Sequence, residues 1–200
     1  MGTAGAIGEV VLPRRVRPQP TPELNQGGDC GACVIGGALD MSVEDVYARL
    51  KGERRSIEHG EMSRMLRVAI MYGLADRAID EACDWPSHYW GCGSFGRPSH
   101  YLSLPWFDTV RMAIDAGYYG IATVDTSGAR GTQGGTNHWV MICGARNRGH
   151  KEYDGTLTGE VLISDSRRAV NMVERWIEAR EFLEQHGGFD VKFVRPTVVP

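Results

Sequence analysis

The chain has 200 residues, 42% of them hydrophobic, and a formal net charge of −3 from 22 basic and 25 acidic side chains. This length suits one domain, or two small lobes around a cleft. The mixed charges argue against a basic surface for nucleic acid or anionic membranes, and no apolar run is long enough to span a bilayer.

The cysteines indicate the compartment in which the protein works. There are five of them at irregular spacing, and the first twenty residues lack the basic and apolar segments of a secretory signal. Both observations argue against a disulfide framework. We therefore expect a cytoplasmic protein made in a reducing compartment, or a virion-associated one if the chain is viral.

Glycines and prolines are frequent in residues 1–23, which predicts an extended N-terminal arm. Residues 9–12 within it could form an edge strand. The arm is a candidate contact for a protein partner in a larger assembly. Residues 24–200 then form the folded domain.

The first predicted helix covers residues 30–39 and follows a glycine turn. Asp29 stands where a side chain caps a helix N-terminus. Gly36 and Gly37 lie inside this helix, where each glycine costs about 1 kcal/mol relative to alanine. We therefore expect another segment to pack closely against them.

Hydrophobic spacing and turn residues predict the remaining elements. Residues 80–106 are rich in aromatic side chains without regular periodicity, and they could form one wall of a substrate cleft or a lid over the core. In the first case, residues 85–106 and the loop 127–136 would line the cleft. Helices come first and mostly antiparallel strands follow, which predicts an α+β fold. The expected helices are 42–50, 59–72, 106–116 and 173–186, and the expected strands are 120–125, 138–144, 161–165 and 189–195.

Four residue types stand in the order that a thiol hydrolase needs. Gln26 precedes the cysteine that opens the first helix, His138 begins an apolar strand, and Asp165 ends the next strand. The dipole of a helix stabilises a thiolate at its N-terminus. A histidine can take the thiol proton, and a carboxylate can orient the imidazole. A side-chain amide can donate to the oxyanion of a tetrahedral intermediate.

Cys30 and Cys33 form a Cys-x-x-Cys pair, which other kinds of site also use. A zinc site needs two more ligands at short spacing, and the sequence has no second pair of this kind. A redox dithiol usually follows a strand directly, whereas proline and glycine precede this pair. The two cysteines could also be buried structural residues. The candidate zinc ligands elsewhere are His59, Cys83, Cys92 and His100.

The surroundings of His138 favour a catalytic role. A glycine-rich loop precedes it and an apolar strand follows it. Residues near the shared end of two antiparallel strands can be neighbours, which lets Asp165 reach the imidazole. Asp125, at the end of the preceding strand, is the alternative partner. Trp139 could shield the pair from water or belong to the core.

These segments resemble the active-site segments of papain-like cysteine peptidases. The resemblance rests on Asn25-Gln-Gly-Gly-Asp-Cys-Gly-Ala-Cys33 and on Asn137-His138. Within that clan, the Asp-Cys-Gly motif before a short helix, the His-Trp-Val strand and the strand ending in aspartate are similar to bacterial and phage C39-type peptidases, the bacteriocin-processing group. The resemblance implies a papain-like fold, in which a helical lobe carrying the cysteine helix packs on an antiparallel sheet carrying histidine and aspartate.

The resemblance leaves two candidates for the nucleophile. The C39-type pattern selects Cys30, and the papain pattern selects Cys33. The family glutamine usually precedes the nucleophile by six positions, whereas Gln26 precedes Cys30 by four and Cys33 by seven. If Asp29 caps the helix, Cys30 lies in its first turn and Cys33 lies one turn deeper, in the core.

The resemblance also implies a reaction. A thiolate attacks a peptide or amide carbonyl, His138 moves the proton, Asp165 orients His138, and Gln26 holds the oxyanion together with a helix N–H. No metal or organic cofactor is implied, and the expected partner is a peptide or protein substrate. Two alternatives use the same scaffold: a peptidoglycan amidase or endopeptidase, and a catalytically silent papain-like domain in a larger assembly such as a phage particle.

Overall fold

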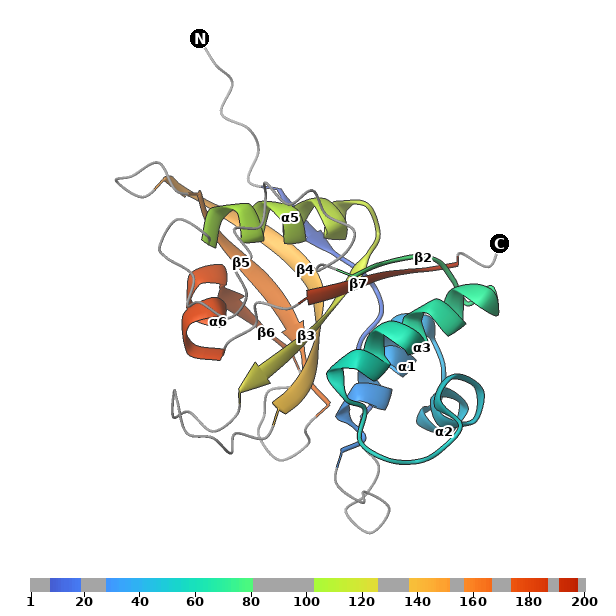
Figure 1. Cartoon of the computed structure of the whole chain (residues 1–200). Helices are drawn as coiled ribbons and strands as arrows, with labels where there is room; N and C mark the ends of the chain where they lie inside the picture. Colours follow the sequence, from blue (N-terminus) through green and yellow to red (C-terminus); the bar gives the residue numbers. More distant parts are fainter. Residues whose placement is uncertain are drawn as a thin grey trace.

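The computed structural model describes residues 8–18, 28–80, 103–125, 137–151, 157–166, 174–186 and 191–197. Seven strands form one antiparallel sheet with helices on both of its faces (Figure 1). The strands are β1 (Glu9–Val11), β2 (Ala75–Asp80), β3 (Tyr119–Asp125), β4 (Asn137–Lys151), β5 (Leu157–Ser164), β6 (Glu174–Glu178) and β7 (Val191–Pro196). The helices are α1 (Cys30–Leu39), α2 (Val43–Asp45), the π-helix η1 (Val46–Lys51), α3 (His59–Met71), α5 (Ser103–Asp115) and α6 (Ala179–His186).

The strand order β2-β7-β3-β4-β5-β6 places the two strands of the predicted site, β4 and β5, side by side. β4 is the longest strand and has two neighbours along one edge. β3 pairs with its first part, up to Ile142, and β1 pairs with Gly144 to Arg146. The edge strand predicted at residues 9–12 is therefore confirmed.

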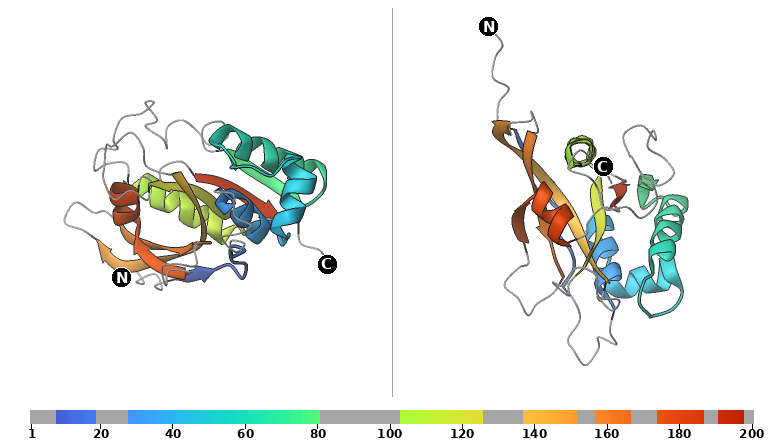
Figure 2. Two further views of the ribbon diagram at one scale, coloured as in Figure 1. Left: turned by 90° about the horizontal axis from the view of Figure 1, so that it is seen from below. Right: turned by 60° about the vertical axis from the view of Figure 1, so that its left-hand side comes forward.

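The sheet separates two hydrophobic clusters. One joins α1, η1 and α3 to one face of the sheet, and the other joins α5 and α6 to the opposite face (Figure 2). Side chains of β4 alternate between them: Trp139 and Met141 enter the first cluster, and Val140 and Ile142 enter the second. Because both faces of β4 are covered, residues 139–143 form a continuous apolar run.

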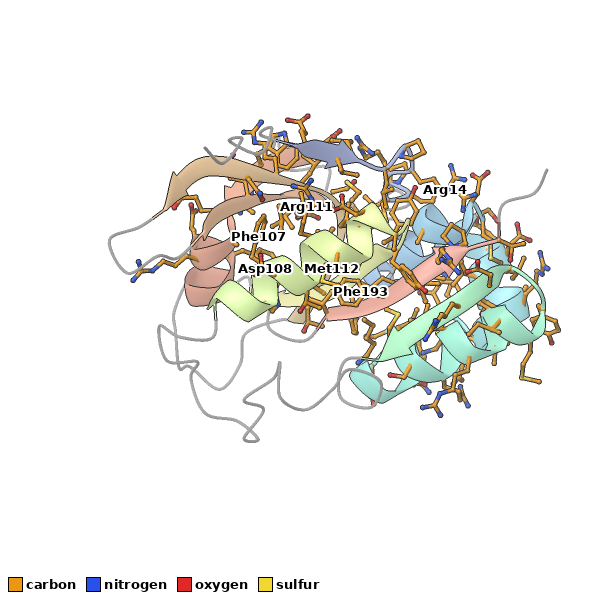
Figure 3. All side chains as sticks on the ribbon, turned by 90° about the horizontal axis from the view of Figure 1, so that it is seen from above. Arg14, Phe107, Asp108, Arg111, Met112 and Phe193 are labelled. Atoms are coloured by element: carbon orange, nitrogen blue, oxygen red, sulfur yellow. The ribbon has the colours of Figure 1, made fainter. Side chains whose placement is uncertain are left out.

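Residues 8–18 lie against the sheet and α1. The side chain of Arg111, which Figure 3 labels on α5, donates to the carbonyl oxygen of Gly8 at 2.7 Å and so ties α5 to the start of this segment. The guanidinium of Arg14 donates to the carbonyl oxygen of Ala38, at the end of α1, also at 2.7 Å. The domain boundary predicted at residue 23 lies outside the described residues.

The close packing predicted at the glycine pair of α1 is present. A Cβ atom on Gly37 would lie 2.4 Å from the carbonyl oxygen of Arg15 and 2.6 Å from Cα of Val16. The backbone N–H of Arg17 donates to the carbonyl oxygen of Cys33 at 3.0 Å. The N-terminal segment therefore covers the side of α1 that its glycines leave open, and α1 is buried along its whole length.

Local signals set the ends of the next helices. Ser42 caps α2, where its hydroxyl accepts the N–H of Asp45 at 3.0 Å. Glu58 and Glu61 form a capping box at the start of α3, and Gly73 follows its end with a φ of 69°. The helix predicted over residues 42–50 is split, since α2 continues as η1.

The sequence predicts one helix over residues 173–186, and this is wrong for its first part, which forms strand β6 before α6. Trp176 and Ile177 of β6 pack against opposite clusters while the strand pairs with β5. Pairing with the edge of the sheet thus outweighs helical spacing. Strand β2, which pairs with β7, has no counterpart among the predicted elements. In the part of the chain that the structure describes, no helix has the length and apolar character needed to cross a membrane.

Candidate active site

Cys30 is the first residue of α1, and 8% of its surface is exposed. The N–H groups of a first helical turn have no partner within the helix, so they favour a negative charge beside them. The side-chain cap predicted for Asp29 is wrong, because its carboxylate accepts no hydrogen bond from the helix backbone. The carbonyl oxygen of Asp29 does begin the helix, by accepting the N–H of Cys33 at 2.8 Å.

His138 and Asp165 come together across the end of the β4–β5 pair. His138 is the second residue of β4, and Asp165 directly follows β5. The register sets Met141 opposite Ser164, so the aspartate reaches the histidine diagonally. The distance between Nε2 of His138 and Oδ1 of Asp165 is 2.7 Å, and His138 is only 6% exposed. The structure therefore brings these two predicted residues together.

The thiol of Cys30 and the side chain of His138 lie close enough for each to shift the pKa of the other. Nε2 of the imidazole faces Asp165, which leaves Nδ1 for the thiol. Burial acts to raise the pKa of the Cys30 thiol. Hydrogen bonds from His138 and from the backbone N–H groups of Trp139 and Gly31 outweigh burial, so the pKa of the thiol is lowered.

The pKa of His138 moves in the opposite direction. Burial acts to lower it, but the hydrogen bonds to Asp165 and Cys30 outweigh burial and raise it above its ordinary value. A thiol with a lowered pKa next to an imidazole with a raised pKa favours a thiolate–imidazolium pair.

Cys33 has different surroundings, although it lies only one helical turn further on. It is fully buried in the core, close to Ser166. Burial, followed by the negative charges of Asp29 and Cys30, raises the pKa of the Cys33 thiol to about 12. The Cys33 thiol is therefore protonated at neutral pH.

Asp29 belongs to a partly buried polar cluster that the sequence did not predict. Its carboxylate is 2.6 Å from the hydroxyl of Tyr47, which donates to it, and 2.8 Å from Nη2 of Arg54. Asp29 is 4% exposed, and burial together with this carboxylate raises the pKa of Tyr47. The partners are 18 and 25 positions from Asp29 in the chain, so no local spacing indicates them.

Trp139 belongs to the core, one of the two alternatives predicted for it. It is buried, and its indole N–H donates to the carbonyl oxygen of Ile57 at 2.9 Å. A Cβ atom on Gly31 would lie 3.1 Å from the indole ring. The residue after His138 therefore packs directly against the turn that carries Cys30.

Several predicted features lie outside the described residues. They include Gln26, the side chains of Asp125 and His59, and most of the two segments predicted to line a cleft. Within the described ranges, no three His, Cys, Asp or Glu side chains form a group that could hold a metal ion. The remaining zinc candidates, Cys83, Cys92 and His100, also fall outside those ranges.

Solved structures identify the architecture. A chain from Bacillus anthracis, assigned as a C39-like peptidase, matches with a TM-score of 0.52 over 95% of this chain and 100% of the other. This is the papain-like α+β fold. The fold predicted from the sequence is therefore confirmed.

The similarity of sequence is low, at 13% identity to the Bacillus anthracis chain. The SERA5E protein of Plasmodium falciparum also matches at 13% identity, over 91% of this chain and 88% of the other, with a TM-score of 0.39, which is too low to show a shared fold. No family model and no curated protein matches the sequence. The comparisons thus show a papain-like fold and leave the activity open.

Proposed function

We propose that the chain is a papain-like thiol hydrolase that cleaves peptide or amide bonds in a peptide or protein substrate. Cys30 is its nucleophile, His138 its general base and acid, and Asp165 the residue that orients His138. The observation that carries the proposal is the arrangement of three side chains: the His138 imidazole is hydrogen-bonded to the Asp165 carboxylate at 2.7 Å and lies close enough to the Cys30 thiol for each of these two groups to shift the pKa of the other.

The choice of Cys30 over Cys33 follows from the chemical state of the two thiols. Only a thiolate is a strong nucleophile. Cys30 begins a helix and contacts His138, which lowers its pKa, whereas burial raises the pKa of Cys33 to about 12. Cys33 is then a core residue of the cysteine helix.

In the acylation step, the Cys30 thiolate attacks the carbonyl carbon of the scissile bond. The carbonyl oxygen becomes an oxyanion, which the backbone N–H of Cys30 stabilises, together with the amide of Gln26 in this proposal. The bond to the leaving amine then breaks, and the His138 imidazolium gives that amine its proton. The products of this step are the free amine and a thioester on Cys30.

In the deacylation step, neutral His138 takes a proton from a water molecule, whose oxygen attacks the thioester. Collapse of the second tetrahedral intermediate releases the carboxylic acid product and restores the thiolate–imidazolium pair. Asp165 accepts a hydrogen bond from Nε2 throughout, which keeps Nδ1 of His138 directed at the sulfur.

A substrate-independent test uses p-nitrophenyl acetate, an activated ester that many nucleophilic thiols accept. We expect a burst of nitrophenol close to one equivalent per protein, and an acetyl group on the peptide that contains Cys30. The burst should disappear in Cys30→Ala and fall strongly in His138→Ala, whereas Cys33→Ala should keep it.

Two results would contradict the proposal. Acetylation on Cys33 would transfer the nucleophilic role to the second cysteine. An absence of any burst in the folded wild-type protein would favour the catalytically silent papain-like domain. If the burst is present, hydrolysis of peptidoglycan fragments compared with that of peptides would separate an amidase from a peptidase.

The site also suggests the compartment. Cys30, Cys33 and Cys143 are all free thiols in the structure. A thiolate nucleophile works only while it stays reduced. We therefore propose that the enzyme acts in a reducing environment such as the cytoplasm.

A further inference from the structure

The loop between η1 and α3 makes unusually close contacts with the turn that carries Cys30. We call residues 54–57 the clamp loop. A Cβ atom on Gly28 would lie 2.8 Å from Cβ of Ser56, and one on Gly31 would lie 3.0 Å from Cβ of Ile57. Glycine at both positions thus lets the clamp loop approach the backbone on each side of Cys30.

Asp29, which lies between Gly28 and Gly31 in the chain, has a buried carboxylate that the clamp loop binds through Arg54. Arg54 donates to Asp29 at 2.8 Å, and Tyr47 donates to the other carboxylate oxygen at 2.6 Å. Only 5% of the Asp29 side chain is exposed, compared with 36% of Arg54. A buried carboxylate with two donors on separate oxygens has little freedom to rotate. The peptide unit that joins Asp29 to Cys30 is therefore held from two sides: by the anchored side chain of Asp29, and by the hydrogen bond that its carbonyl oxygen accepts from the N–H of Cys33 at 2.8 Å.

The clamp loop also contacts the strand that carries the histidine. The carbonyl oxygen of Ile57 accepts the indole N–H of Trp139, the residue next to His138. One loop of four residues thus touches both the turn of the proposed nucleophile and the start of β4. These two parts of the site belong to different elements, and the clamp loop connects them directly.

The clamp loop is itself held in place. The ammonium group of Lys51 donates to the carbonyl oxygen of Ser56 at 2.9 Å and to the Glu61 carboxylate at 2.8 Å. The Lys51 side chain is almost completely buried, and the hydrogen bond from Lys51 is the main cause that lowers the pKa of Glu61 to about 2. Lys51 therefore ties the clamp loop to the first turn of α3.

We propose that Arg54 is a positioning residue that, through Asp29, aims the backbone N–H of Cys30 at the oxyanion. The inference rests on the proposed function, because it assigns a role in the same acyl transfer. The N–H of Cys30 belongs to the peptide unit that Asp29 fixes, and an oxyanion donor is effective only when its direction is set in advance. Arg54 does not touch the sulfur, so its effect on catalysis is indirect.

If Arg54 has this role, its loss should affect two reactions of the Cys30 thiol differently. Acylation by p-nitrophenyl acetate passes through an oxyanion, whereas alkylation by chloroacetamide displaces chloride at a saturated carbon and forms none. Arg54→Ala should therefore slow acylation of Cys30 about tenfold or more, because a misdirected oxyanion donor is costly. Alkylation of Cys30 at the same pH should change by less than about threefold.

Three further variants make the test specific. Arg55→Ala removes the same charge from the adjacent loop position, but Arg55 pairs with Glu53 and Glu61, so both rates should stay at the wild-type level. Arg54→Lys retains a donor and should recover part of the acylation rate. Tyr47→Phe removes the hydroxyl that donates to the other oxygen of Asp29 and changes no charge. It therefore tests the positioning of Asp29 even if Arg54→Ala does not fold.

The ratio of the acylation rate to the alkylation rate decides the matter. A ratio that falls in Arg54→Ala and Tyr47→Phe but not in Arg55→Ala supports the positioning role. Equal losses in both reactions would show a merely structural role, and unchanged rates would show none. If the wild-type protein is alkylated at Cys30 but never acylated, the proposed function fails first, and this inference fails with it.

Discussion

The first turn of α1 and the turn that follows it belong to one helix, but they place their cysteines in opposite chemical states. Cys30 lies where the helix begins and contacts His138, and its pKa is lowered. Cys33 lies in the core beside Ser166, and its pKa is raised to about 12. Two identical side chains in one helix thus differ in reactivity because of their position along its axis.

The second half of α1 continues the same trend toward a purely structural role. Its glycines contact the N-terminal segment, and all of its residues are buried. Substitutions in the first turn should therefore change chemistry with little effect on stability. Substitutions further along should change stability with little effect on chemistry.

The largest effect is expected for Cys30→Ala. Loss of the nucleophile should reduce acyl transfer by at least about 10⁴-fold, as in other enzymes that lose one member of a catalytic unit. The midpoint of thermal unfolding should stay within a few degrees of the wild-type value. Activity assays with p-nitrophenyl acetate and calorimetry check both. A variant that still shows the burst would place the nucleophile elsewhere.

Gly37→Ala should have the next largest effect, on stability. Its new Cβ atom would collide with the backbone of Arg15 and Val16, and overpacking of this kind costs about 2 kcal/mol. Urea unfolding measures the loss, and the alkylation rate of Cys30 serves as the readout of the site. If Gly37→Ala slows alkylation as strongly as it lowers stability, the two ends of α1 do not act separately.

Asp165→Asn should have a smaller effect, on reactivity at low pH. Asp165 helps to keep the pKa of His138 raised, and protonated His138 helps to keep the pKa of Cys30 lowered. Without the carboxylate both shifts shrink, so the thiolate fraction at pH 6 should fall about tenfold for each unit by which the thiol pKa rises. The alkylation rate should recover at alkaline pH. A rate that stays low at every pH would mean damage to the fold instead.

Cys33→Ala should have the smallest effect. Removing one buried sulfur atom leaves a small cavity, for which we expect a loss of about 1 kcal/mol in the free energy of unfolding. The alkylation profile of Cys30 should not change. A marked shift of that profile would mean that the two thiols are coupled more strongly than their surroundings suggest.

The predicted fold and the His138–Asp165 pair could be recognised because each depends on a short pattern. Short segments of sequence indicate helix N-termini, apolar strands and strand ends. When two consecutive strands pair in antiparallel fashion, the start of the first lies beside the end of the second. The cluster of Asp29 with Tyr47 and Arg54 could not be recognised, since it forms only when η1 and the clamp loop fold over α1. Strand β6 differs from the predicted helix for a related reason: its pairing with β5 outweighs its helical spacing.

The most direct test of the account compares cysteines within one molecule. The wild-type protein is alkylated with chloroacetamide over a series of pH values, and the modified peptides are quantified by mass spectrometry. The account predicts that Cys30 reacts well below the pH range of an ordinary thiol, while Cys33 and Cys143, whose pKa values are both raised to about 12, remain unmodified. Equal or slower reaction of Cys30 at every pH would contradict a thiolate–imidazolium pair, and the proposed thiol hydrolase with it.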